Sequence, residues 1–188
     1  LTSMSWLHGD AWLVTGTTVF GLTLVVLYTV STMYHSFRSV PVKRLLRKFD
    51  HAAIFLLIAG SYTPFLLVTL RSPWGWALFA LVWGLAVVGI ALKFWFAGRY
   101  KVASTLLYVA MGWLCLTMLR PLLQVLPREG FWLLLAGGLC YTGGAAFYLW
   151  KRLPYHHAVW HLWVMAGSAF HWAAVFLYVV PRIAAAPV

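Results

Sequence analysis

Three histidines at the ends of apolar stretches could bind a metal ion. In the segment HHAVWH, residues 156–161, His157 and His161 are four residues apart and therefore share one face of a helix. His35 closes the first apolar stretch of the chain. Neutral imidazoles are good zinc ligands, and three protein ligands leave the fourth tetrahedral position open for water, as in catalytic sites. We therefore predict a zinc site made by His35, His157 and His161.

Two further polar residues are predicted to act beside this site. Asp50 begins the second apolar stretch, and Ser31 precedes His35 by about one helical turn. An open zinc site can lower the pKa of bound water from near 15.7 to about 7. Asp50 could accept the proton of that water or orient it, and Ser31 could hydrogen-bond the water or a developing oxyanion. Because polar side chains at membrane depth are rare, their convergence at one predicted depth favours a functional site.

Each of these residues also has a structural interpretation. The histidine pair of the last stretch could make interhelical hydrogen bonds. Asp50 could cap the second helix or pair with Arg47 or Lys48. Ser31 could donate a hydrogen bond to the carbonyl group of Leu27 in its own helix. These alternatives stay open at the level of the sequence.

The remaining polar and small residues are assigned packing roles. His171 lies about 15 Å farther along the helix than His161, so we expect it to make a buried polar contact instead of joining the same metal. Cys115 and Cys140 show neither metal-ligand spacing nor a disulfide framework. Pro64 is expected to kink the second helix near Tyr62 because it lacks an N–H donor. The small residues of the fifth stretch, expected to let another helix approach closely, include Gly137, Gly138, Gly143 and Gly144.

The elements that must position the site are six long apolar stretches. Hydrophobic residues make up 63% of the 188 residues and charged residues 9%. A stretch of about 20 apolar residues in a helix spans a hydrocarbon core of about 30 Å. We predict an all-α, polytopic transmembrane helix bundle that forms a single domain over residues 1–188. The predicted spans are residues 11–34, 51–70, 74–92, 102–119, 130–150 and 158–180.

The formal net charge of +11 follows from the basic connections between these spans. The connections after the first, third and fifth spans hold ten basic residues: Arg38, Lys43, Arg44, Arg47, Lys48, Lys93, Arg99, Lys101, Lys151 and Arg152. The four others are Arg71, Arg120, Arg128 and Arg182. The positive-inside rule places the connections after the first, third and fifth spans in the cytoplasm, with no need for a nucleic-acid partner. The longest connection, residues 36–49, is predicted to be a basic loop.

Three sequence blocks resemble a known family. STMYH, KFDHAAIFLLIAGSYTPF and LPYHHAVWHLWVMAGSAFHW look like the signature blocks of the hemolysin III branch of the progestin and adipoQ receptor family. That family is similar to the adiponectin receptors and, more distantly, to the alkaline ceramidases. The resemblance implies that His35, His157 and His161 bind zinc, and that Asp50 and Ser31 hydrogen-bond the metal-bound water.

The resemblance also implies a topology. Family members have a seven-helix bundle with a cytoplasmic N-terminus and a zinc site near the cytoplasmic face. Because only six spans are visible here, we expect the family's first helix to precede this sequence. We expect a bacterial inner (plasma) membrane location, with the metal site near the cytoplasmic side.

Two classes of function are compatible with these features. The leading expectation is a zinc-dependent, ceramidase-like membrane hydrolase acting on an amide or ester in a lipid-like substrate. The alternative is a non-enzymatic regulator of membrane homeostasis, or a receptor-like protein, with a structural zinc site. A bis-histidine haem or proton carrier is disfavoured because the paired histidines share one helix face. The expected partners are membrane lipids and a lipid-like small molecule, while the physiological metal and the oligomeric state stay open.

Overall fold

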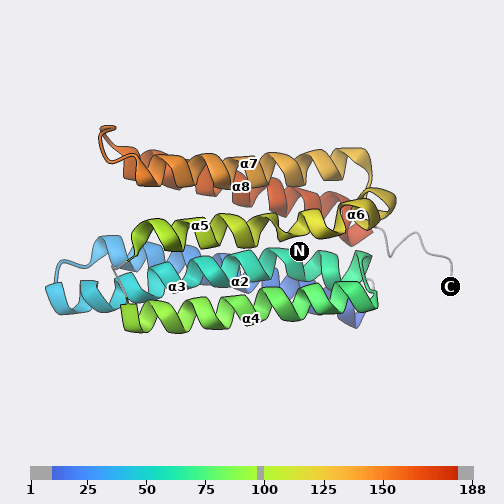
Figure 1. The fold of residues 1–188 in the computed structure, drawn as a ribbon, viewed down its shortest axis with the longest axis horizontal. Coiled ribbons are helices and arrows are strands. Elements are labelled where there is room, and N and C mark those ends of the chain that lie inside the picture. Colours follow the sequence, from blue (N-terminus) through green and yellow to red (C-terminus); the bar gives the residue numbers. More distant parts are fainter. Residues whose placement is uncertain (1–9, 97–99, 182–188) are drawn as a thin grey trace. The chain divides into compact units, whose positions relative to one another are not determined.

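The computed structural model describes residues 10–96 and 100–181, and within these ranges every regular element is a helix. In chain order (Figure 1) they are α2 (Ala11–Ser36), α3 (Val40–Pro64), the π-helix η1 (Phe65–Thr69), α4 (Pro73–Phe96), α5 (Lys101–Gly112), the 3-10 helix η2 (Trp113–Met118), α6 (Leu119–Val125), α7 (Arg128–Leu149) and α8 (His156–Tyr178). The predicted all-α class is confirmed. His8, Arg99 and Arg182 lie outside the described residues.

The helices belong to two compact units, which divide between Lys101 and Val102. The first unit contains α2, α3, η1 and α4, and the second contains the elements from α5 to α8. Each unit is described by itself below. The expectation of a single domain over residues 1–188 stays a prediction.

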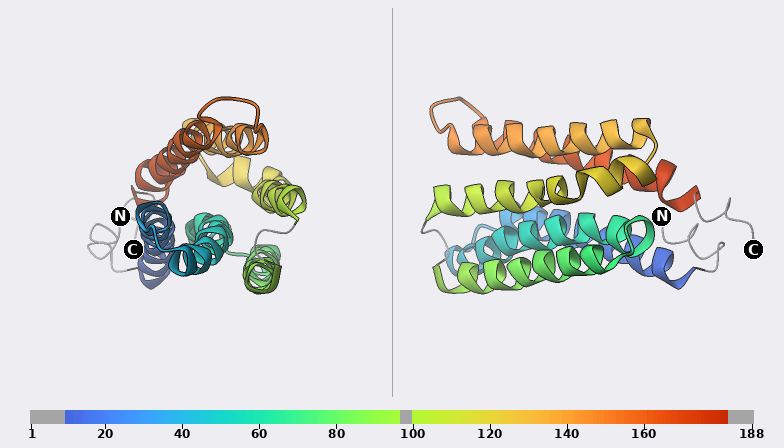
Figure 2. Two further views of the ribbon diagram at one scale, coloured as in Figure 1. Left: turned by 90° about the vertical axis from the view of Figure 1, so that its left-hand side faces the viewer. Right: turned by 45° about the vertical axis from the view of Figure 1, so that its right-hand side comes forward.

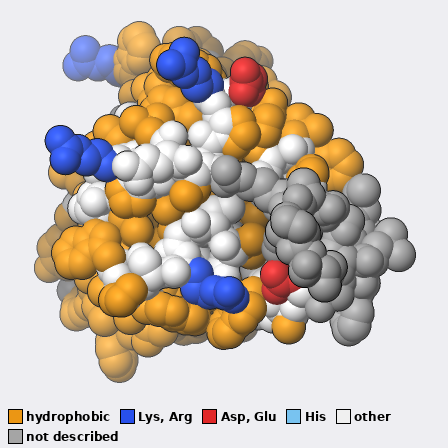
Figure 3. All heavy atoms as spheres, turned by 90° about the vertical axis from the view of Figure 1, so that its right-hand side faces the viewer, with side chains coloured by type: hydrophobic (Ala, Val, Ile, Leu, Met, Phe, Trp, Pro, Cys, Tyr) orange, Lys and Arg blue, Asp and Glu red, His pale blue; other side chains and the backbone are white. Residues whose placement is uncertain are grey.

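Five helical segments among the described residues are long and apolar enough to cross a membrane: Ala11–Ser36, Val40–Thr69, Pro73–Phe96, Lys101–Val125 and Arg128–Leu149. Large apolar side chains on them are more than half exposed, among them Leu22, Val25 and Val87. At the end of the helices drawn in Figure 3, hydrophobic side chains are joined by charged ones, Lys or Arg in blue and Asp or Glu in red. The protein is therefore an integral, multi-pass membrane protein.

The sixth predicted span, 158–180, corresponds to α8, which is helical over nearly the same residues. Four histidines make α8 more polar than the other long helices: His156, His157, His161 and His171. Its passage through the membrane stays a prediction.

The second helix begins at Val40 and not near residue 51, so the predicted basic loop over 36–49 is wrong. Only Phe37, Arg38 and Ser39 separate α2 from α3. Pro41 is tolerated in the first helical turn, where its missing N–H would have no intrahelical partner, and the Lys, Arg and Leu residues that follow are good helix formers. Hydropathy marks where a helix enters the apolar core, which differs here from where the helix begins.

In the first unit, α3 packs against both α2 and α4 (Figure 2). Glycines permit this approach: a Cβ atom at Gly16 would lie 2.9 Å from the Cα atom of Pro64, and one at Gly89 would overlap the ring of Phe55. Pro64 interrupts the α-helical hydrogen bonding, in line with the distortion predicted near Tyr62. Beyond it, the chain continues as the π-helix η1, closed by the N–H of Leu70, which donates to the carbonyl of Phe65 at 2.8 Å.

In the second unit, α7 and α8 run side by side (Figures 1 and 2). Two buried glycines of α7 face α8, as predicted for the small residues of this stretch. A Cβ atom at Gly137 would overlap the ring of His171, and one at Gly144 would lie 2.9 Å from the Cβ atom of Trp163. The close packing of α7 on α8 therefore depends on the absence of side chains at these positions.

Polar contacts accompany this packing. The Nε2–H group of His171 donates to the carbonyl oxygen of Leu134 at 3.3 Å, and the hydroxyl groups of Tyr141 and Ser168 are 2.9 Å apart. The predicted buried polar contact of His171 is confirmed. Both contacts join α7 to α8. They satisfy polar groups that the surrounding apolar side chains could not hydrogen-bond.

The adjacent glycines of α7 provide a matched test of this packing. Gly137→Ala is expected to lower the free energy of unfolding by about 1–3 kcal/mol, because the new methyl group displaces the ring of His171. Gly138→Ala is the control, since its Cβ atom would lie 3.8 Å from Trp113, an ordinary contact. Thermal unfolding in detergent measures both variants, and equal midpoints would contradict the packing described.

Candidate metal centre

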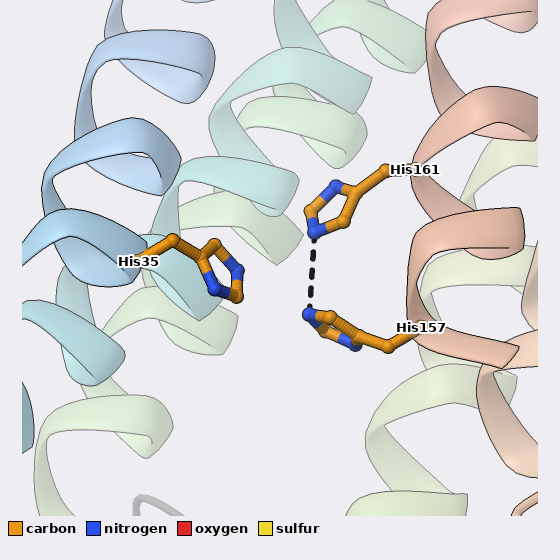
Figure 4. Close-up of side chains that lie close together, drawn as sticks. All are labelled: His35, His157 and His161. Carbon is orange, nitrogen blue, oxygen red and sulfur yellow. Dashed lines mark hydrogen bonds between the residues drawn. The ribbon is translucent and has the colours of Figure 1, made fainter. Parts of the chain in front are cut away.

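The second unit contributes two histidines from the start of α8. His161 lies one helical turn after His157, and the Nε2 atoms of the two residues are 3.2 Å apart (Figure 4). Trp160 lies beside both rings, with centroid distances of 5.1 Å to His157 and 4.4 Å to His161. Tyr148 of α7 packs in turn on Trp160 at 4.9 Å. These aromatic contacts restrict the rotamers of the two imidazoles and keep their Nε2 atoms together.

The spacing of this pair fits two ligands of one tetrahedral ion. Two nitrogens bound to zinc at about 2.0–2.1 Å are about 3.3–3.4 Å apart. The observed separation of 3.2 Å between His157 Nε2 and His161 Nε2 is close to that value. Without a cation, one of these nitrogens must carry a proton and donate it to the other. With a cation, both lone pairs are used, so the pair suits a metal at least as well as a mutual hydrogen bond.

The first unit contributes a second polar group, which involves α2 and α3. Asp50 is only 4% exposed, and the hydroxyl group of Ser31 donates a hydrogen bond to its carboxyl group. His35, in the last turn of α2, is near enough to interact electrostatically with the same carboxyl group. Ser31 and His35, which are one helical turn apart on α2, therefore both interact with the carboxyl group of Asp50.

The three predicted ligands come from two helices, α2 and α8. His35 belongs to the first unit and the pair to the second. For that reason, binding of one ion by all three residues belongs to the proposal below.

The structural alternative in which Asp50 caps the second helix can now be judged. The capping interpretation of Asp50 is wrong, because α3 begins at Val40 and Asp50 lies in the interior of the helix. Its partner is Ser31, on the neighbouring helix. The proposed chemical roles of Asp50 and Ser31 stay predictions.

Sequence reasoning missed two features of this region. It did not single out Tyr148 or Trp160, which pack beside the histidine pair. It also read the basic segment before Asp50 as a loop, although this segment is helical and buries the Nε atom of Arg47. Lys43 and Arg47 are four residues apart, and Asp50 follows three residues later. This spacing indicated a helix with the three charged side chains on one face.

The fold and these side chains define a class: a multi-pass helical membrane protein with a candidate histidine metal centre. A family model described as Haemolysin-III related matches residues 1–172. The chain is 50% identical over 174 residues to Hemolysin-3 of Bacillus cereus, covering 93% of this chain and 80% of that protein. It is 43% identical over 173 residues to Hemolysin-3 homolog of Bacillus subtilis (strain 168), covering 92% and 81%.

A more distant relative comes from animals. The chain is 29% identical over 181 residues to Monocyte to macrophage differentiation factor of Homo sapiens, covering 92% of this chain and 74% of that protein. The chain belongs to the haemolysin-III related family. The resemblance found in the three sequence blocks is confirmed.

The bond between Ser31 and Asp50 can be tested by truncating the hydroxyl group. Ser31→Ala is expected to lower the free energy of unfolding by about 1–3 kcal/mol, because the buried carboxyl group loses a partner that apolar neighbours do not replace. Thr32→Ala is the matched control, since Thr32 is exposed and its hydroxyl group bonds the carbonyl of Tyr28 in the same helix. A thermal unfolding midpoint for Ser31→Ala as high as that of the control would argue against the bond.

Proposed function

We propose that this protein is a zinc-dependent membrane hydrolase that cleaves an amide or ester bond in a lipid-like substrate. The observation that carries the proposal is the combination of two functional groups. A pair of imidazole nitrogens is spaced as metal ligands, and a buried carboxyl group is bonded to Ser31. A metal-ligand set and a carboxyl group that can move a proton are what hydrolysis of a carbonyl compound requires.

The proposed zinc ligands are His35, His157 and His161. Their donor set of three imidazoles suits zinc and leaves one coordination position for water or substrate. When bound, zinc would polarise a substrate carbonyl group and make water more acidic. Trp160 packs on His157 and Tyr148 packs on Trp160, and these contacts limit the movement of the histidine pair.

Asp50 is the proposed proton carrier. Its carboxylate would accept a proton from the attacking water and return it to the nitrogen or oxygen of the leaving group, so that the carboxylate is regenerated. Ser31 uses its hydroxyl proton in the bond to Asp50, and we therefore assign it the role of positioning residue. The same bond would hold the carboxyl oxygen lone pairs in a constant direction, which favours proton transfer.

The proposed substrate class follows from the surroundings. The helices that carry these residues expose large apolar side chains, and a substrate with acyl chains can reach them from the bilayer without passing through water. The basic connections support a location of the metal site near the cytoplasmic side of a bacterial inner membrane.

A structural role for zinc, in a regulator of membrane homeostasis or a receptor-like protein, is the second candidate. It is favoured by the ring contacts of Trp160 with His157 and His161, since a structural zinc ion equally requires ligands that are held in place. In that case removal of the metal would lower the stability of the protein, and the zinc-loaded protein would show no turnover. The first experiment below tests zinc binding, which both candidates require, and the second tests turnover, which separates them.

Zinc content tests the ligand set. Wild-type protein is expected to contain about one zinc ion per chain, and His157→Ala or His161→Ala to lose most of it, because two remaining imidazoles hold zinc weakly. His156→Ala is the matched control, since His156 adjoins His157 but is not a proposed ligand. Elemental analysis after dialysis against a weak chelator gives the stoichiometry. Full zinc content in both ligand variants would end the proposal.

Turnover tests the role of the carboxyl group. Asp50→Asn is expected to lower hydrolysis of a fluorogenic long-chain lipid amide in nanodiscs by at least about 100-fold while zinc stays bound, because the amide cannot accept the proton. Asp10→Asn is the control, since Asp10 caps the opposite end of α2 from His35. Zinc-loaded wild-type protein that hydrolyses neither lipid amides nor esters would instead support the structural role.

A further inference from the structure

Two cationic side chains extend the polar face of α3 beyond the residues used above. Lys43, Arg47 and Asp50 are spaced i, i+4 and i+7, so they lie along one face of the helix, about 10 Å from end to end. Asp50 receives its hydrogen bond from Ser31 of α2. The two cations lie on the side of Asp50 toward the beginning of α3, and the proposed hydrolysis assigns them no role.

Arg47 is the more informative of the two cations. Its side chain is half-buried, and its Nε atom is buried without a hydrogen-bond partner among the described residues. A buried donor without an acceptor destabilises the protein, and more so when the group is charged. A ligand that offered an oxygen acceptor at this position would remove that penalty.

Lys43 lies one helical turn from Arg47 on the same face. Its Nζ atom is 5.5 Å from the centroid of the Tyr34 ring on α2, and this cation–π contact orients the side chain. Because an ammonium group has three donors, it can bind an anion as well as the ring. The first turn of α3 adds the positive end of the helix dipole, since Ser39 makes no side-chain capping bond there.

The length of α3 gives the depth of this pair of cations. The segment Val40–Thr69 has 30 residues and is therefore about 45 Å long, whereas the hydrocarbon core is about 30 Å thick. The segment is therefore about 15 Å longer than the core. Its basic residues are all near the beginning of α3, so we assign the excess to that end, in the headgroup region. Val42, Leu45 and Phe49 are exposed on the opposite face of the same turns, which suits contact with the upper parts of acyl chains.

We propose that Lys43 and Arg47 form a binding site for the phosphate group of an anionic membrane phospholipid. The charge of the site is complementary to such a headgroup, its depth matches the phosphate layer, and the guanidinium fork together with the buried Nε–H supplies directed donors. The exposed apolar side chains on the opposite face of the same turns contact other lipids of the bilayer. This site is independent of zinc binding and of hydrolysis.

Binding of short-chain lipids to the full chain in detergent tests the proposal. Dioctanoyl phosphatidylglycerol is titrated by calorimetry, with dioctanoyl phosphatidylcholine and inorganic phosphate as separate arms. Phosphatidylglycerol is expected to bind at least about tenfold more tightly than phosphatidylcholine. Inorganic phosphate, which has no acyl chains, is expected to compete only weakly. Equal binding of the two lipids, or tighter binding of inorganic phosphate, would overturn the assignment to an anionic lipid.

Two arginines of one helix provide the matched variants. Arg47→Gln is expected to weaken phosphatidylglycerol binding about tenfold and Arg44→Gln less than about twofold, because Arg44 is exposed although it carries the same charge. Arg47→Lys, which keeps the charge but loses the fork and the Nε–H, should fall between them. Equal effects at Arg44 and Arg47 would show unspecific attraction and overturn the site. Lys43→Gln, expected to weaken binding about threefold, gives an independent result if Arg47→Gln does not fold, and unchanged affinity in that variant would also count against the site.

Discussion

A buried carboxyl group in an apolar bundle must be given partners by the protein, because neither lipid chains nor the apolar core can hydrogen-bond it. Asp50 meets this constraint through Ser31 and the nearby imidazole of His35. The same rule accounts for further polar contacts. His157 lies against His161, and the hydroxyl groups and histidine between α7 and α8 pair across that interface. Other buried hydroxyl groups, such as those of Thr17 and Thr63, donate to carbonyl groups of their own helices.

Close helix packing makes these groups possible. Side-chain hydrogen bonds between helices are short, so the helix axes must approach closely, and glycine allows this where a Cβ atom would not fit. In the first unit, Gly16 and Gly89 bring α2 and α4 close to α3, which carries Asp50. In the second unit, Gly137 and Gly144 do the same for α7 and α8. The packing residues and the candidate functional residues thus depend on one another.

The length of α3 connects membrane position with chemistry. Because the helix continues unbroken from Val40, its basic turns and Asp50 belong to the same rigid element as the apolar residues that follow. Membership of the haemolysin-III related family, with relatives named Hemolysin-3, fits an integral membrane protein and by itself assigns no reaction.

The sequence by itself determined the class of fold, because runs of about 20 apolar residues have one stable form in a bilayer, the helix. It also determined the candidate ligands His157 and His161, since residues four apart share a helix face, and it predicted that Ser31 and His35 act together for the same reason. It did not reveal that α3 begins at Val40, because hydropathy is blind to the helical turns outside the core. Only the tertiary structure decided which side chains on different helices meet, such as Ser31 with Asp50, because helix rotation and axial position are set by packing between helices and not by any one helix.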